Sequence, residues 1–294
     1  MRMKSICARL LCLLAAPLLA SLPFAAAQDG QILMPEQSAA KAKQLLQQTI
    51  EAMGGNAFLH VRDITCIGHY SQFGHSTELE GFEKFQDYVE PPNMSRTENL
   101  PQRNIVEVYN NDKGWTLDRG GVAEAPTADL IRFQEGIKKD IGNILRNRIH
   151  EPDMNFRYTG IDIIDLHEVD WVELTDSEDR TLRIAIDRSS HLPIRLDVEQ
   201  RNPTTRAVTK ETNLYSNYHP IDGIQTPFQT ERDRNGMKIY QVFFDSCQYN
   251  TGLPASLFTR ESLDERWQKT GKKERAKEKK HEQKLEKDTA SSNQ

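Results

Sequence analysis

The sequence predicts a mostly β domain with two helices, an α+β fold whose strands form an antiparallel sheet. Three observations support this prediction. Apolar and polar residues alternate over most of the segment 61–249, as in strands that bury one face. Two segments, 35–53 and 128–148, change to the spacing of an amphipathic helix. Turn signals such as Asn235-Gly236 separate the expected strands closely, which favours hairpins over long crossovers.

The first expected element is the helix over residues 35–53. Pro35 suits the first turn of a helix, and Gly54-Gly55 marks the end. Apolar side chains and one threonine recur every three or four residues on one side of the helix, at Ala42, Leu45, Leu46, Thr49, Ile50 and Met53. This stripe must be covered, and the face of a sheet is the simplest cover.

About twelve strands follow in two groups, with the second helix between the groups. The first group comprises 61–73, 76–89, 94–100, 104–110 and 113–118. The helix is expected over 128–148, with Thr127 as its N-cap and Pro152 as a stop. The second group comprises 155–164, 167–175, 180–187, 192–200, 206–218, 224–233 and 237–249. Short turns can link most of these strands, so we expect antiparallel pairing.

The ends of the chain differ in composition from the segment between them. Residues 1–27 combine a basic start, an apolar run and the small residues Ala25 to Ala27, which predicts a secretory signal peptide cleaved after Ala27. We therefore expect an exported, soluble, periplasmic protein without a transmembrane anchor, since no later segment is apolar enough to span a bilayer. Residues 28–267 are expected to form a single domain, and 268–294 a charged flexible tail.

The net charge of −5 is unevenly distributed. Residues 1–27 carry three positive charges and residues 272–294 a net of three, which leaves about −11 on the segment between them. Binding to nucleic acid depends on clustered Lys and Arg, so we expect no nucleic-acid partner. Apolar residues make up 37% of the chain when Tyr is counted, and about 40% when the 16 Gly are counted in place of the 8 Tyr. Because an average globular domain contains roughly 45–50%, much of the secondary structure must face water.

Signatures of catalysis, metal binding and cofactor binding are missing from the sequence. It contains no G-x-S-x-G, H-E-x-x-H, P-loop or dinucleotide-binding motif, and its eight histidines are scattered singly. We therefore expect no metal site, no cofactor and no enzyme activity. Carboxylates gather near residues 162–170 and 176–179 and could perform acid–base chemistry if they were buried at a fixed separation. A hydrolase with such a carboxylate pair stays open as an alternative.

Two cysteines remain if the signal peptide is removed, namely Cys66 and Cys247. Both fall in expected strands, and an oxidising compartment allows them to pair. We predict a disulfide between them, with two buried free thiols as the alternative. Neither belongs to a C-x-x-C pair, so a thioredoxin-type redox role has no support.

The order of elements resembles the superfamily of periplasmic lipoprotein carriers and outer-membrane lipoprotein-sorting proteins. The resemblance extends over residues 38–258 and rests on "AMGG", "GFEKFQDYVEPPNMSRTE", "NDKGWTLDRGG", "AIDRSSHLPIRLDVE", "YSNYHPIDGIQTPFQTE" and "NTGLPASLF". It implies a curved, unclosed antiparallel half-barrel of about eleven to twelve strands, with helices over the concave face as a lid. It also implies a carrier or sensor of lipoprotein acyl chains. Such carriers have an arginine that latches the lid; no motif assigns it in this chain, and Arg96 is a guess for it.

The apolar strand faces and the second helix predict a cavity that binds an acyl chain. The expected ligand-binding residues lie on two neighbouring strands, on the covering helix and on the last strand: Ile184, Ile186, Ile194, Leu196 and Val198; Phe133, Ile137, Ile141 and Ile144; Tyr240, Val242 and Phe244. We expect a lipid or lipoprotein carrier with partner proteins in the cell envelope. An envelope sensor or regulator is the alternative, as is a scaffold whose cavity is filled by its own side chains.

Overall fold

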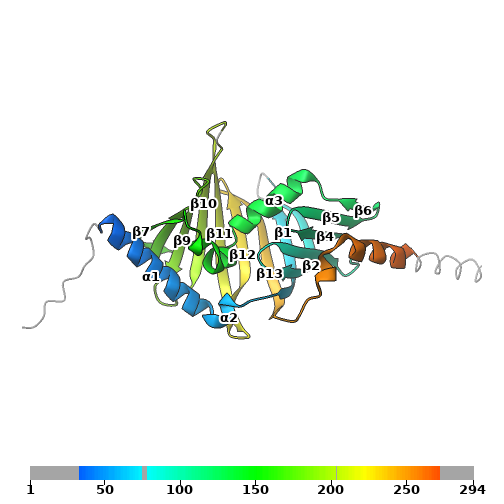
Figure 1. Ribbon diagram of the computed structural model, residues 1–294, viewed down its shortest axis with the longest axis horizontal. Helices are drawn as coiled ribbons and strands as arrows, with labels where there is room; N and C mark the ends of the chain where they lie inside the picture. The colour runs from blue at the N-terminus through cyan, green and yellow to red at the C-terminus, as the bar shows by residue number, and fades with distance from the viewer. Residues whose placement is uncertain (1–32, 75–77, 203, 272–294) are drawn as a thin grey trace, which may run out of the picture. The chain divides into compact units, whose positions relative to one another are not determined.

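Thirteen strands form one antiparallel sheet, which is curved and does not close (Figure 1). The computed structural model of the chain describes residues 33–74, 78–202 and 204–271, and from Met34 onward these belong to one compact unit. The expected signal peptide, 1–27, and residues 272–294 of the expected tail lie outside the described residues. Residues 260–271 are helical, so the described start of the tail continues that helix.

The sheet consists of two meanders that join edge to edge. The N-terminal meander comprises β1 (Ile64–Phe73), β2 (Leu79–Glu90), β3 (Met94–Leu100), β4 (Val106–Asn110), β5 (Lys113–Asp118) and β6 (Gly121–Glu124). The C-terminal meander comprises β7 (Asn155–Ile164), β8 (His167–Thr175), β9 (Thr181–Asp187), β10 (Pro193–Arg201), β11 (Val208–Ile221), β12 (Ile224–Arg234) and β13 (Met237–Tyr249). Pairing of β1 with β13 joins the meanders and leaves β6 and β7 as the two edges.

The open, mostly β fold predicted from the sequence is confirmed, with one more strand than the upper expected number. Each of the twelve expected strands is present, and their bounds differ from the prediction by at most three residues. The additional strand is β6, which has four residues and directly follows the Arg119-Gly120 turn. Four residues are too few for an alternating pattern to be recognised.

The expected helix over 128–148 is in fact three short elements, so the prediction of one continuous helix was wrong. These are α3 (Thr127–Lys138), α4 (Ile141–Arg146) and the 3₁₀ turn η1 (Arg148–His150). Asp140 has an extended backbone, and its carboxylate accepts a hydrogen bond from the Asn143 amide at 2.6 Å, which starts a new helix. Pro126, and not Thr127, is the residue that precedes α3.

Helix α1 (Pro35–Met53) covers one face of the C-terminal meander, where it packs against β7 and β8 (Figure 1). Its apolar stripe, including Leu46 and Ile50, forms the main core together with buried side chains of β8, β9 and β10. The short helix α2 (Asn56–Leu59) follows directly. Gly54 between the helices has a φ of 127°, and a Cβ there would lie 2.5 Å from the carbonyl oxygen of Gly223. Only glycine fits this close approach.

The N-terminal meander carries helices on both faces. Tyr109 of β4 stacks on Phe133 of α3, with the ring centroids 4.6 Å apart. The neighbouring Val108 points to the other face, where it packs with Phe258 of the 3₁₀ turn η2 (Ala255–Phe258) and with Leu263. Arg96 also lies on this second face, where it pairs with Glu98 at 2.7 Å and donates to the Leu257 carbonyl at 3.1 Å. These contacts hold the C-terminal segment and do not latch α3.

Cys66 and Cys247 form a disulfide. The two residues are direct partners in the register of β1 and β13, so the bond crosses the junction between the meanders. Of the helices that the structure describes, none is both long and apolar enough to cross a membrane.

Candidate functional site

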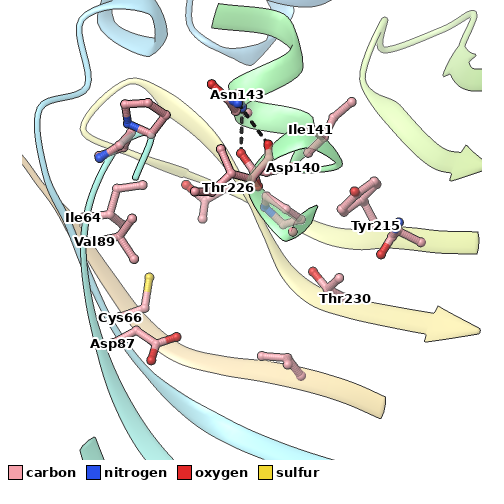
Figure 2. Close-up of a pocket in the computed structure, with 18 of the residues that line it drawn as sticks. Ile64, Cys66, Asp87, Val89, Asp140, Ile141, Asn143, Tyr215, Thr226 and Thr230 are labelled. Atoms are coloured by element: carbon pink, nitrogen blue, oxygen red, sulfur yellow. Dashed lines mark hydrogen bonds between the residues drawn. The ribbon is translucent and has the colours of Figure 1, made fainter. Parts of the chain in front are cut away.

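A cavity of about 510 Å³ lies between the α3–α4 segment and the sheet. Its walls come from β1, β2, β11, β12 and β13 on one side and from α3 and α4 on the other (Figure 2). Most of the wall is apolar and includes Ile64, Val89, Phe133, Val242 and Phe244. The size falls within the ~300–1,000 Å³ that is usual for small-molecule sites.

The structure brings six of the twelve expected ligand-binding residues to this cavity. They come from the covering segment and from the last strand, and they are Phe133, Ile137, Ile141, Tyr240, Val242 and Phe244. Their side chains meet across the cavity because β13 lies near the middle of the sheet, beside β12 and β1.

The other six expected residues lie elsewhere. Five are almost completely buried in the main core, which α1 and α4 share with the sheet, namely Ile144, Ile184, Ile186, Leu196 and Val198. Ile194 lies on the opposite face of the sheet, where it packs against Val169 and Trp171. The register of β10 shifts between Pro193 and Arg195, and this bulge turns Ile194 away from the face that holds Leu196.

Helix α3 covers the cavity loosely, in contrast to the way α1 covers the main core. Helix α1 has seven buried residues, whereas α3 has none. The C-terminal end of α3 is held by ion pairs: Glu135 with Arg180 at 2.7 Å, and Lys138 with Glu178 at 2.6 Å. An element with little burial and a few anchoring polar contacts can open at a lower free energy than the rest of a domain.

Three polar atoms of residues in the cavity wall have no hydrogen-bond partner among the described residues: Asp87 Oδ1, Arg146 Nε and Asn213 Nδ2. Burial raises the pKa of Asp87 to about 6, although a hydrogen bond from Thr97 acts in the opposite direction. Burial also lowers the pKa of Arg146, an effect that Asp140 and Tyr249 partly offset. Unpaired buried polar groups are costly, and three of the seven such atoms among the described residues belong to the wall of this cavity.

No protein-family model and no curated protein matches this sequence. Solved structures do match its fold. A DUF1329 family protein from Desulfovibrio piger aligns over 77% of this chain and 99% of its own, with a TM-score of 0.56 and 14% identity. Two further structures each align over 76% of this chain and 99% of their own, with a TM-score of 0.51 and 12% identity. One is described as an outer membrane lipoprotein-sorting protein domain from Vibrio parahaemolyticus, and the other is a LolA superfamily protein from Nitrosomonas europaea.

The chain has the fold of these three proteins. The resemblance inferred from the sequence is thereby confirmed at the level of the fold. At identities of 12–14% the likeness is one of architecture, and the residues of the site must be interpreted from their own chemistry.

Carboxylates of the two acidic clusters are bonded to arginines and to a hydroxyl group. Asp170 accepts a hydrogen bond from the Tyr158 hydroxyl at 2.8 Å, and Asp176 pairs with Arg148 and Arg180. The described residues also contain no group of three His, Cys, Asp or Glu that could hold a metal ion.

A second cavity, also of about 510 Å³, contains a serine–histidine–aspartate group. Here the hydroxyls of Ser189 and Ser190 donate to Asp187, and Nδ1 of His167 lies 2.8 Å from the same carboxylate. Burial alone would raise the pKa of Asp187, but these hydrogen bonds hold it well below its usual range. Since the serines bond to the carboxylate and not to the imidazole, the arrangement is not that of a catalytic triad.

The polar wall residues were not predicted from the sequence. Asp87 falls in an expected strand, where an acidic residue among alternating positions indicates the wet face. The sequence did contain an indication, because every second residue of a strand lies on the same face. Phe85, Asp87 and Val89 therefore share one face of β2, and the other two residues are apolar. An acid on an otherwise apolar face is the pattern to look for.

Substitution of Asp87 by Asn is expected to stabilise the ligand-free protein at neutral pH. The folded pKa of about 6 exceeds the ordinary value of 3.8, so this carboxyl stabilises the fold below pH ~4 and loses that contribution as the pH rises through 6. This pKa difference corresponds to a gain in the free energy of unfolding of up to about 3 kcal/mol for the Asn variant at pH ~7.5. Urea unfolding should show this gain at pH ~7.5 and little difference at pH ~4. Asp112→Asn in an exposed turn is the control, and an equal effect of both substitutions would contradict the prediction.

Proposed function

We propose that the protein is a carrier in the cell envelope that binds an acyl chain or another amphiphile in the cavity between α3–α4 and the sheet. The observation that carries the proposal is the apolar cavity of about 510 Å³ beneath a helix with no fully buried residue. A ligand can displace such a cover without disrupting the main core under α1. The fold likeness to lipoprotein-sorting proteins supports the same interpretation.

The free energy available from an acyl chain is sufficient for reversible binding. Burial contributes about 0.8 kcal/mol per methylene, so ten methylenes supply roughly 8 kcal/mol before the costs of opening and ordering. Movement of α3 would expose Phe133 and Ile137, whose contacts with the sheet the ligand replaces. The net affinity is then moderate, as transfer between a donor and an acceptor requires.

An exported location fits two features of the chain. Residues 1–27 have the pattern of a secretory signal, and the Cys66–Cys247 disulfide belongs to an oxidising compartment. We therefore place the protein in the periplasm, with lipid or lipoprotein acyl chains as its cargo and envelope proteins as donor and acceptor.

The substitution Ile137→Glu is expected to abolish saturable binding of a fluorescent long-chain fatty acid. Ile137 lines the cavity, and a glutamate there would place a charge where the chain must lie. We expect affinity to fall at least about tenfold, which corresponds to roughly 1.4 kcal/mol. Fluorescence titration below the micelle concentration of the fatty acid measures this.

Ile131→Glu provides a matched control on the same helix. Ile131 is 54% exposed and does not line the cavity, so the same change of residue should leave binding unaltered there. Leu196→Glu would be a poor probe, because Leu196 is completely buried in the core and its loss would unfold the protein. Absence of binding by the unmodified protein, or equal binding by both variants, would contradict the carrier function.

A further inference from the structure

One acidic side chain lies in the apolar part of the cavity wall. Figure 2 shows Asp87 on β2 next to Cys66, with its carboxylate directed into the space between the strands and α4. Asp87 is paired with Cys66 across β1 and β2, and Cys66 is paired with Cys247 across β1 and β13, so the three share one row of the sheet. Ile64 and Val89 are the other wall residues of β1 and β2.

The hydrogen-bonding capacity of this carboxylate is only partly used. Thr97, its register partner on β3, supplies one hydrogen bond. The Oδ1 atom is buried and has no partner among the described residues. The charge that acts on Asp87 most is the like charge of Glu107, which raises the pKa of Asp87 in the same direction as burial. A carboxylate oxygen in this state accepts a donor from whatever fills the cavity.

Two further unpartnered atoms belong to the same wall, Asn213 Nδ2 and Arg146 Nε, and both are donors. A pure hydrocarbon would leave all three atoms without partners, whereas a group that both donates and accepts can satisfy atoms of both kinds. Three cationic side chains, Lys139, Arg146 and Arg232, line the cavity together with two acidic ones, Asp87 and Asp140, so the wall as a whole does not favour an ammonium group. A neutral hydroxyl or amide meets these requirements.

We propose that Asp87 accepts a hydrogen bond from a hydroxyl or amide N–H of the bound amphiphile, so that the cavity selects acyl or alkyl chains that carry such a donor. This inference rests on the proposed function and specifies its ligand class. It assigns Asp87 a role in specificity, while the apolar wall supplies most of the affinity.

Hexadecanol and its methyl ether test the proposal, because they share the chain and an acceptor oxygen and differ in the donor. Each is used to displace a fluorescent fatty acid from the full-length protein. We expect the unmodified protein to bind the alcohol about tenfold more tightly than the ether, as a hydrogen bond to a charged acceptor implies. In Asp87→Leu the two affinities should become equal, whereas Asp112→Leu, in an exposed turn, should preserve the ratio.

Asp87→Asn keeps the shape of the side chain and is the second variant if Asp87→Leu does not fold. Its amide can also donate to the ether, so the preference for the alcohol should shrink to less than about threefold. Equal affinities for alcohol and ether in the unmodified protein, or an unchanged preference in both Asp87 variants, would overturn the assignment of Asp87 and leave the carrier function intact. Failure of every chain to displace the fatty acid, or to bind at all, would overturn both proposals.

Discussion

Loss of the Cys66–Cys247 disulfide is expected to lower the free energy of unfolding by about 5 kcal/mol in the chain-entropy model, and by less if the reduced chain retains structure. The two cysteines are 181 residues apart, so the bond closes a loop that contains most of the sheet. The bond also crosses the pairing of β1 with β13, where the two meanders meet. Since domains of this kind are stable by only ~5–15 kcal/mol, the reduced protein should be close to unfolding.

Urea unfolding with and without a reductant measures this effect. The double variant Cys66→Ala with Cys247→Ala should reproduce the midpoint of the reduced protein and be insensitive to the reductant. Alkylation of the unreduced, denatured protein should label neither cysteine. Labelling of both thiols, or equal stability of the oxidised and reduced forms, would contradict the prediction.

Sequence periodicity was sufficient for the strands because alternation reports directly on which side of each strand is buried. It could not reveal interruptions that leave the pattern in phase. The apolar residues of 128–148 stay on one side across Asp140, although a new helix starts there. At β10 a bulge changes the side of the sheet although the alternation in the sequence continues. Ile194 and Leu196 are two residues apart, yet the bulge after Pro193 places them on opposite faces. Such local features depend on hydrogen bonds that periodicity does not encode.

The site was predicted in part for a related reason. Alternation showed that Ile184, Ile186, Leu196 and Val198 share an apolar face, and it is the same face that α3 and α4 cover further along the sheet. The side chains of β9 and β10 on this face belong instead to a closed core that also contains buried side chains of α1 and α4. The strands that each helix covers depend on the order of strands in the sheet. This order includes the pairing of the first strand, β1, with the last, β13, which the alternation of apolar and polar residues does not reveal.

Substitution of Arg180 by Ala is expected to destabilise the fold by about 3–5 kcal/mol, the usual cost of removing one partner of a buried ion pair. Arg180 is fully buried at the start of β9 and pairs with Asp176, Glu135 and Glu178 at 2.7, 2.7 and 2.9 Å. Burial alone would raise the pKa of Asp176, but hydrogen bonds from Arg148 and from the backbone lower it, so this group stabilises the fold at neutral pH. Without Arg180, the buried carboxylate of Asp176 loses one of its cationic partners, and Glu135 of α3 loses its ion pair with the sheet.

Arg157→Ala is the matched control, because it removes an arginine from an ion pair at the surface and not from the buried network. Arg157 is exposed and pairs with Glu173 at 2.7 Å, and the loss of such a pair costs no more than about 1 kcal/mol. Urea unfolding should therefore rank Arg180→Ala well below Arg157→Ala in stability. Hydrogen exchange of the α3 amides should accelerate in Arg180→Ala alone, because Glu135 and Lys138 tie the end of this helix to the β8–β9 turn. Similar losses in both variants, with α3 exchange unchanged, would show that the network does not hold the cover over the cavity.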